Sequence, residues 1–133
     1  MTSHVHMIIG SHGEKLENIM RDMKRHTSAT LRNAIQTNPA ESRKEWMLWL
    51  MERAGKKNSN NTDFRLWQQD NHPLELTTPA MAHQKLNYLH YNPVEAGFVE
   101  KPEDYLYSSA IDYYTDRNGK IAIERIDPIL MRP

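Results

Sequence analysis

The segment HVHMII, residues 4–9, places the tightest constraint on how this 133-residue chain can fold. Apolar side chains at positions 5, 7 and 9 alternate with His4 and His6, which is the pattern of a half-buried β-strand. A strand has unpaired backbone groups along both edges, and a stable sheet needs about three strands. The sequence offers two weaker candidates, residues 64–68 and 120–126, so we expect a sheet that is short of strands.

Helical patterns dominate the rest of the chain. Apolar residues recur at three- and four-residue steps over about 14–36, and basic residues occupy the opposite side. A second helix is expected over about 40–54, with Gly55 as its C-terminal cap. A third is expected over about 79–91, preceded by Thr78 as N-cap and ended by Asn92-Pro93, because the residue before a proline disfavours the helical conformation.

Composition excludes several classes of protein. No window reaches the roughly 18 consecutive apolar residues of a membrane span, and we expect no membrane partner. The chain contains no cysteine, which fits a cytoplasmic protein and leaves His, carboxylate or amide groups as metal ligands. Net charge is zero, but residues 14–57 carry ten Lys and Arg against six Asp and Glu, a mild excess that is compatible with a phosphate-binding surface.

His4 and His6 form the first candidate site. Side chains at i and i+2 of a strand project from the same face, with Cα atoms about 6–7 Å apart. Two imidazoles at that spacing can bind one divalent ion. The alternative is a strand whose polar face is simply hydrated, because a pair of surface histidines is common.

Tyr88 and Asn92 form the second candidate site. They are four residues apart, so they share one face of the third expected helix. Two simpler interpretations remain open: Tyr88 as a core aromatic with its hydroxyl at the surface, and Asn92 as the residue that stops the helix before Pro93.

Three segments together give the chain a family resemblance: HVHMII, YLHYNPVEAGFVEKPEDY and the following LYSSA. In this combination the chain resembles the REP-associated tyrosine transposases of the HUH single-strand endonuclease superfamily, from His4 to about Asp112. The resemblance implies an α+β fold, a ferredoxin-like antiparallel sheet with helices packed on one face. It also implies a single transposase domain over 1–133, with an HUH strand at 3–9 and a C-terminal extension at about 98–133.

The resemblance further implies a reaction and its residues. Tyr88 would attack a phosphorus of single-stranded DNA, leaving a 5′-phosphotyrosine link and a free 3′-hydroxyl. His4, His6 and Asn92 would bind a divalent ion, Mg²⁺ or Mn²⁺, that polarises the scissile phosphate. Tyr91 stands where relatives often have Asn, and no catalytic role is assigned to it.

The expected partner is single-stranded or hairpin DNA, bound in the cytoplasm at the nucleoid, and a homodimer is compatible with the family. Lys24, Arg25 and Arg32 on the first helix are the candidate phosphate contacts, with a hydrated helix face as the alternative. Trp67 could stack on a base, but a core tryptophan is the simpler interpretation.

The chain departs from the family at its start. Relatives have a strand, a helix and a further strand before the H-x-H motif, so we expect an N-terminally incomplete sheet and Met1 to be an internal methionine. Two alternatives to the transposase follow. One is a truncated, non-catalytic remnant that binds single-stranded DNA, and the other is an unrelated helical interaction protein in which the H-x-H motif is accidental.

Overall fold

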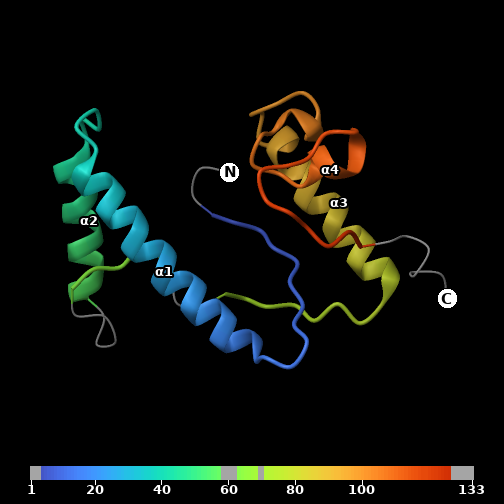
Figure 1. The fold of residues 1–133 in the computed structure, drawn as a ribbon, viewed down its shortest axis with the longest axis horizontal. Helices are drawn as coiled ribbons and strands as arrows, with labels where there is room; N and C mark the ends of the chain where they lie inside the picture. Colours follow the sequence, from blue (N-terminus) through green and yellow to red (C-terminus); the bar gives the residue numbers. More distant parts are fainter. Residues whose placement is uncertain (1–3, 58–62, 69–70, 127–133) are drawn as a thin grey trace. The chain divides into compact units, whose positions relative to one another are not determined.

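The computed structural model describes residues 4–57, 63–68 and 71–126 (Figure 1). The chain divides into two compact units: Gly10–Pro73 forms one, and Met1–Ile9 with Leu74–Pro133 forms the other. The helical elements, in chain order, are α1 Leu16–Thr37, α2 Lys44–Lys56, α3 Pro79–Glu95, the short 3-10 helix η1 Pro102–Asp104 and α4 Ala110–Tyr114. None of the helices in the described ranges is long and apolar enough to cross a membrane.

The predicted ferredoxin-like antiparallel sheet is wrong, because the described part of the chain contains helices and no strand. Residues 4–9, 64–68 and 120–126 are all irregular. Alternating apolar residues make a segment suitable for a sheet, but a strand forms only where a neighbour supplies backbone hydrogen bonds. Here those bonds go elsewhere: the Arg65 amide donates to the Met51 carbonyl (2.8 Å), and the Ile126 amide donates to the Tyr113 hydroxyl (2.8 Å).

Helix α3 begins as expected and ends later than expected. The Thr78 hydroxyl accepts a hydrogen bond from the Met81 amide at 3.2 Å, and proline occupies the first helical turn. Pro93 does not stop the helix, because it lies in the last turn and removes only one backbone donor there. The helix ends at Glu95, and the φ of 73° at Gly97 allows the paired bonds of a Schellman motif, from the Gly97 amide to the Val94 carbonyl and from the Phe98 amide to the Pro93 carbonyl.

In the Gly10–Pro73 unit, α1 packs against α2, and the segment 63–68 is bonded to both helices. The Trp67 indole donates to the Thr27 hydroxyl of α1 at 2.9 Å. The Lys24 ammonium donates to the Gln68 carbonyl at 2.7 Å. Trp67 is therefore partly buried and bonded inside this unit, which agrees with the simpler of the two sequence interpretations.

Gly55 was expected to cap α2, but α2 continues to Lys56 and Gly55 is buried in its last turn. A Cβ atom on residue 55 would lie 2.7 Å from both Cα and the amide nitrogen of Phe64. The glycine therefore allows the backbone of the 63–68 segment to approach α2 closely. Close approach, and not a left-handed backbone conformation, explains this glycine.

The second unit is built on α3. Its buried apolar residues include Ala82 and Leu86 of α3, Ala110 and Ile111 of α4, and the prolines Pro93 and Pro102, and η1 packs against both helices. His90, 1% exposed, is the largest fully buried side chain among the described residues. A polar ring thus occupies the centre of a small apolar core.

The close approach at Gly55 gives a prediction about stability. We expect Gly55→Ala to lower the free energy of unfolding by about 1–3 kcal/mol, because the added methyl group collides with backbone atoms that cannot rotate away. Urea denaturation followed by circular dichroism measures the change. Gly10→Ala is the matched control: no atom lies within 4 Å of its Cβ position, so a change within about 0.5 kcal/mol is expected. Equal effects of the two substitutions would contradict this account.

Candidate functional site

The two predicted histidines lie beside the predicted tyrosine. The ring centres of His6 and Tyr88 are 5.4 Å apart, with the ring planes at 81°. The rings of His4 and His6 are 4.9 Å apart, nearly perpendicular. Residues 4–9 and α3 belong to the same compact unit. Folding therefore brings together two motifs that are far apart in the sequence.

The separation of the His4 and His6 rings is compatible with a shared metal ion, although the same separation is also ordinary for edge-to-face packing of two rings. A metal–nitrogen distance of about 2.1 Å, with ring nitrogens about 1.1 Å from the ring centre, separates two coordinated rings by about 4.5–5.3 Å at ordinary coordination angles. The His4–His6 separation of 4.9 Å lies within that range. No three His, Asp or Glu side chains within the described ranges form a metal-binding group, so further ligands would be amide, phosphate or water oxygens.

The protonation of His6 also suits a ligand. Partial burial, with the nearby His4 as the second cause, lowers the pKa of His6 below its usual value. The neutral imidazole, which has a free lone pair, is therefore favoured at neutral pH. That neutral form is the one that binds metal ions.

Asn92, the third predicted metal ligand, is much more buried than Tyr88. It lies one helical turn after Tyr88, but it is 9% exposed whereas Tyr88 is 49% exposed. Its side-chain oxygen is buried and has no hydrogen-bond partner among the described residues. A buried amide oxygen without a partner costs about 1–3 kcal/mol, so this acceptor is chemically suited to a ligand, although protein atoms cover it here.

The three candidate DNA contacts belong to the other unit and already have partners. The Lys24 ammonium bonds the Gln68 carbonyl, and Arg25 pairs with Asp22 at 3.1 Å. Arg32 lies 3.8 Å from Glu52, with its guanidinium over the Phe64 ring at 4.6 Å. These are surface interactions worth no more than about 1 kcal/mol each, so a phosphate could compete for the cations.

Sequence reasoning missed the role of His90. Its Nε2 lies 3.0 Å from the Ser109 hydroxyl, and its ring lies 5.1 Å from Tyr113 and 5.5 Å from Tyr114. The available signal was spacing, because His90 lies four residues after Leu86 on the face of α3 that the core covers. His90 therefore fixes α3 against the C-terminal part of the unit.

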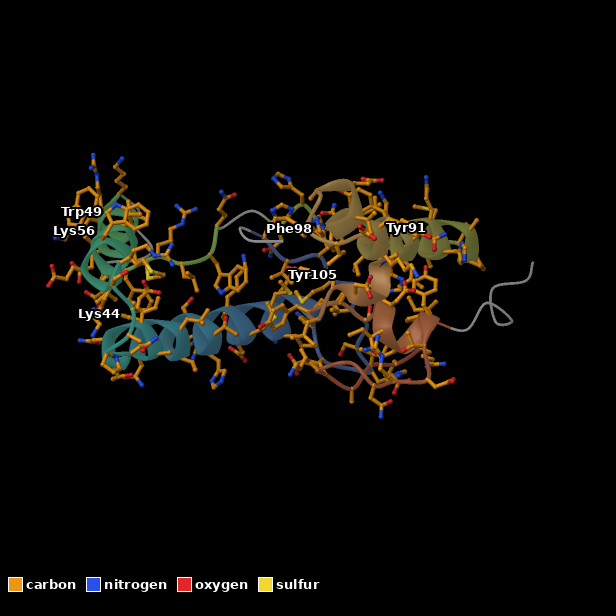
Figure 2. All side chains as sticks on the ribbon, turned by 90° about the horizontal axis from the view of Figure 1, so that it is seen from above. Lys44, Trp49, Lys56, Tyr91, Phe98 and Tyr105 are labelled. Carbon is orange, nitrogen blue, oxygen red and sulfur yellow. The ribbon has the colours of Figure 1, made fainter. Side chains whose placement is uncertain are left out.

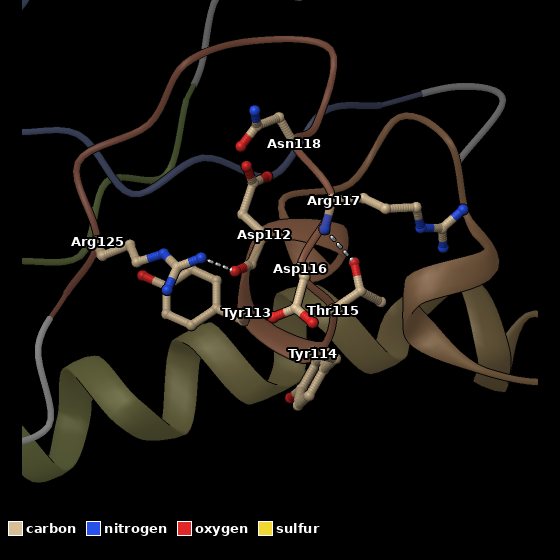
Figure 3. A pocket seen from close by; sticks show the side chains of 8 residues that line it. All are labelled: Asp112, Tyr113, Tyr114, Thr115, Asp116, Arg117, Asn118 and Arg125. Carbon is tan, nitrogen blue, oxygen red and sulfur yellow. Dashed lines mark hydrogen bonds between the residues drawn. The ribbon is translucent and has the colours of Figure 1, made fainter.

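A polar pocket is lined by the last residues of α4, the chain that follows this helix, and Arg125 (Figure 3). Asp112 accepts a hydrogen bond from the Gly119 amide at 3.0 Å, and its backbone carbonyl accepts one from Arg125. Figure 3 shows the Arg125 guanidinium reaching this carbonyl across the Tyr113 ring. These contacts hold residues 115–126 in place, and none of the predicted site residues lines the pocket.

Burial of His90 predicts how stability depends on pH. Desolvation lowers the pKa of the folded-state imidazole below its ordinary value of about 6.5. The unfolded chain therefore binds more protons than the folded chain between these two pKa values, and the free energy of unfolding should fall as pH decreases below about 6.5. In urea titrations from pH 8 to pH 5, His90→Gln should lose most of this slope, while His6 contributes in the same direction.

Ser109→Ala is the matched control for that experiment. It removes the hydroxyl that contacts Nε2 but keeps the buried imidazole, so the protein should be less stable at every pH while keeping the pH-dependent slope. A loss of slope in this variant would show that the hydrogen bond, and not burial, controls the protonation of His90.

Comparison with known proteins adds no relative: no protein-family model, curated protein or solved structure matches this chain. The resemblance to REP-associated tyrosine transposases therefore rests on the motifs HVHMII, YLHYNPVEAGF and LYSSA themselves. A function for the chain has to be argued from those residues and from the arrangement of His4, His6 and Tyr88.

Proposed function

We propose that this chain is a metal-dependent transposase that cleaves and rejoins single-stranded DNA with Tyr88 as the nucleophile. One observation carries the proposal: the ring of His6 lies 5.4 Å from the ring of Tyr88, and His4 lies next to His6. An accidental H-x-H motif would have no reason to lie against the tyrosine that the second motif singles out. The proposal does not depend on the sheet that the sequence predicted.

The chemistry assigned to Tyr88 is a transesterification. Tyr88 is 49% exposed, which leaves this residue accessible to a DNA strand. The phenol oxygen forms a bond to phosphorus while the bond from phosphorus to the 3′ oxygen breaks, and the departing oxygen takes up a proton as the phenol loses one. The phosphodiester energy is kept in the phosphotyrosine, so a 3′-hydroxyl can later displace Tyr88 and rejoin the strand.

His4, His6 and the Asn92 amide are the residues that would hold Mg²⁺ or Mn²⁺. A bound ion would polarise the scissile phosphate and offset its negative charge. The protein's own contribution is to keep His6 neutral and beside Tyr88. Single-stranded or hairpin DNA would be the substrate in the cytoplasm, at the nucleoid, with a homodimer as the proposed assembly.

A second candidate function is a protein that binds single-stranded DNA without cleaving it. The observation that favours it is the Asn92 side-chain oxygen, which protein atoms cover in this structure. If that oxygen stays covered, the histidine pair has one ligand fewer than the cleavage site requires. Lys24, Arg25 and Arg32 would then serve binding alone.

Covalent capture of DNA separates the two functions. Wild-type protein is incubated with Mn²⁺ and single-stranded hairpin DNA from the region that flanks the gene, and adducts are detected by denaturing gel electrophoresis. We expect an adduct from the wild type and at least a hundredfold less from Tyr88→Phe, because only the hydroxyl can form the ester. His6→Ala should also lower the yield strongly, since it removes one imidazole of the pair.

Tyr91→Phe is the matched control, because Tyr91 lies on the same helix, is 46% exposed and has no assigned role (Figure 2). Its adduct yield should equal that of the wild type. Noncovalent DNA binding without an adduct from the wild type would favour the binding protein. An adduct that persists in Tyr88→Phe and disappears in Tyr91→Phe would move the nucleophile to Tyr91.

A further inference from the structure

Helix α2 exposes two tryptophans. Trp46 is 59% exposed and Trp49 is 50% exposed, and Leu50 beside them is 39% exposed. Positions 46, 49 and 50 are spaced three and four residues apart, so the three side chains share one face of the helix. Trp67, by contrast, is hydrogen-bonded inside the same unit. Two large aromatic rings on one helix face are available for a partner.

Basic residues occupy the same face of α2. Arg53 lies seven residues after Trp46, and Lys56 lies seven after Trp49, so each is two helical turns further along the same side. Lys57 follows as the exposed C-cap. Figure 2 shows Trp49 and Lys56 on one side of α2. The tryptophans therefore belong to a surface that is both aromatic and cationic.

The arginine on this face contacts one of the rings. The Arg53 guanidinium lies over the Trp49 ring at 5.0 Å from its centre, a cation–π arrangement. Trp49 nevertheless keeps half of its surface exposed. Arg53 thus orients the ring and leaves room for another flat group to stack on it.

The positive charge of this face of α2 indicates which class of partner it can bind. Residues 43–57 carry five Lys and Arg against two Glu, so a second copy of this face would bring like charges together. A nucleic-acid strand supplies the opposite charge in its phosphates. It also supplies flat bases, and these can stack on exposed rings only when they are unpaired. The face therefore suits a single strand better than a second copy of the chain.

We infer that this face of α2 is a docking surface for single-stranded DNA, with bases stacked on Trp46 and Trp49 and phosphates held by Arg53, Lys56 and Lys57. The inference rests on the proposed function insofar as single-stranded DNA is the substrate. It adds a contact surface outside α1, to which the sequence assigned DNA binding. It also gives a role to Trp46 and Trp49, whose exposure is not explained by packing within the unit.

Fluorescence anisotropy with a labelled 20-nucleotide oligo(dT) tests the inference. The full chain is used in EDTA, so that binding is measured without cleavage. Trp46→Leu and Trp49→Leu should each weaken binding about tenfold, because stacking on one aromatic ring contributes roughly that much and leucine keeps the helix propensity. Trp67→Phe is the matched control, and its affinity should equal that of the wild type.

The dependence of binding on salt tests the basic residues separately. Each phosphate contact on a single strand contributes about −0.7 to the slope of log affinity against log salt concentration. Arg53→Gln with Lys56→Gln should therefore reduce the slope by about 1.4, while the tryptophan variants should leave it unchanged. Lys44→Gln, at the first residue of the same helix and nine residues before Arg53, is the matched charge control and should keep the slope. Arg53 and Lys56 are exposed, so we expect their substitution to leave the packing of α2 intact.

Two outcomes would overturn the inference. One is unchanged oligo(dT) affinity and salt slope in all of the α2 variants. The other is a dimer, seen by sedimentation velocity without DNA, that dissociates in Trp46→Leu and Trp49→Leu while their DNA affinity stays the same, which would make this face a protein interface. Failure of the proposed function is seen elsewhere, as a missing Tyr88 adduct while α2-dependent oligo(dT) binding persists.

Discussion

The anchoring of α3 by His90 is the interaction on which the candidate site depends. Its imidazole lies inside the core, bonded to Ser109 and flanked by Tyr113 and Tyr114. The apolar core around it is small, and this contact, together with the packing of η1 against both helices, holds α3 against the C-terminal part of its unit. Because one face of α3 is fixed in this way, Tyr88 on an uncovered part of the helix stays exposed to solvent and next to His6.

The two motifs of the site place different demands on the chain. The proposed nucleophile Tyr88 lies on a regular helix, α3, which is capped at Thr78 and followed by a Schellman motif at Gly97. His4 and His6 lie on an irregular segment, so their position depends on contacts with α3 and not on a ladder of backbone bonds. A metal ion bound by the two rings would fix this segment against α3 only if a group of α3, such as the Asn92 amide, also bound the ion.

The basic residues of α1 and those of α2, both in the Gly10–Pro73 unit, have different surroundings. The cations of α1 bind a carbonyl, carboxylates and an aromatic ring of the same unit, and so contribute to its packing. The cations of α2 lie beside exposed tryptophans, where a stacked and phosphate-bearing partner can use both kinds of group. Net charge summed over the chain hides this division, because the signs cancel.

The sequence by itself determined the local features: three long helices, the cap at Thr78, and the candidate residues His4, His6, Tyr88 and Asn92. These follow from periodicity, capping and motif spacing, which act over a few residues. Only the tertiary structure showed that the alternating segments do not pair as strands and that α3 continues through Pro93. It also showed that Gly55 allows the Phe64 backbone to approach α2 and that the His6 ring lies beside the Tyr88 ring. Each of these depends on contacts between segments far apart in the sequence, and a local pattern carries no information about which neighbour is present.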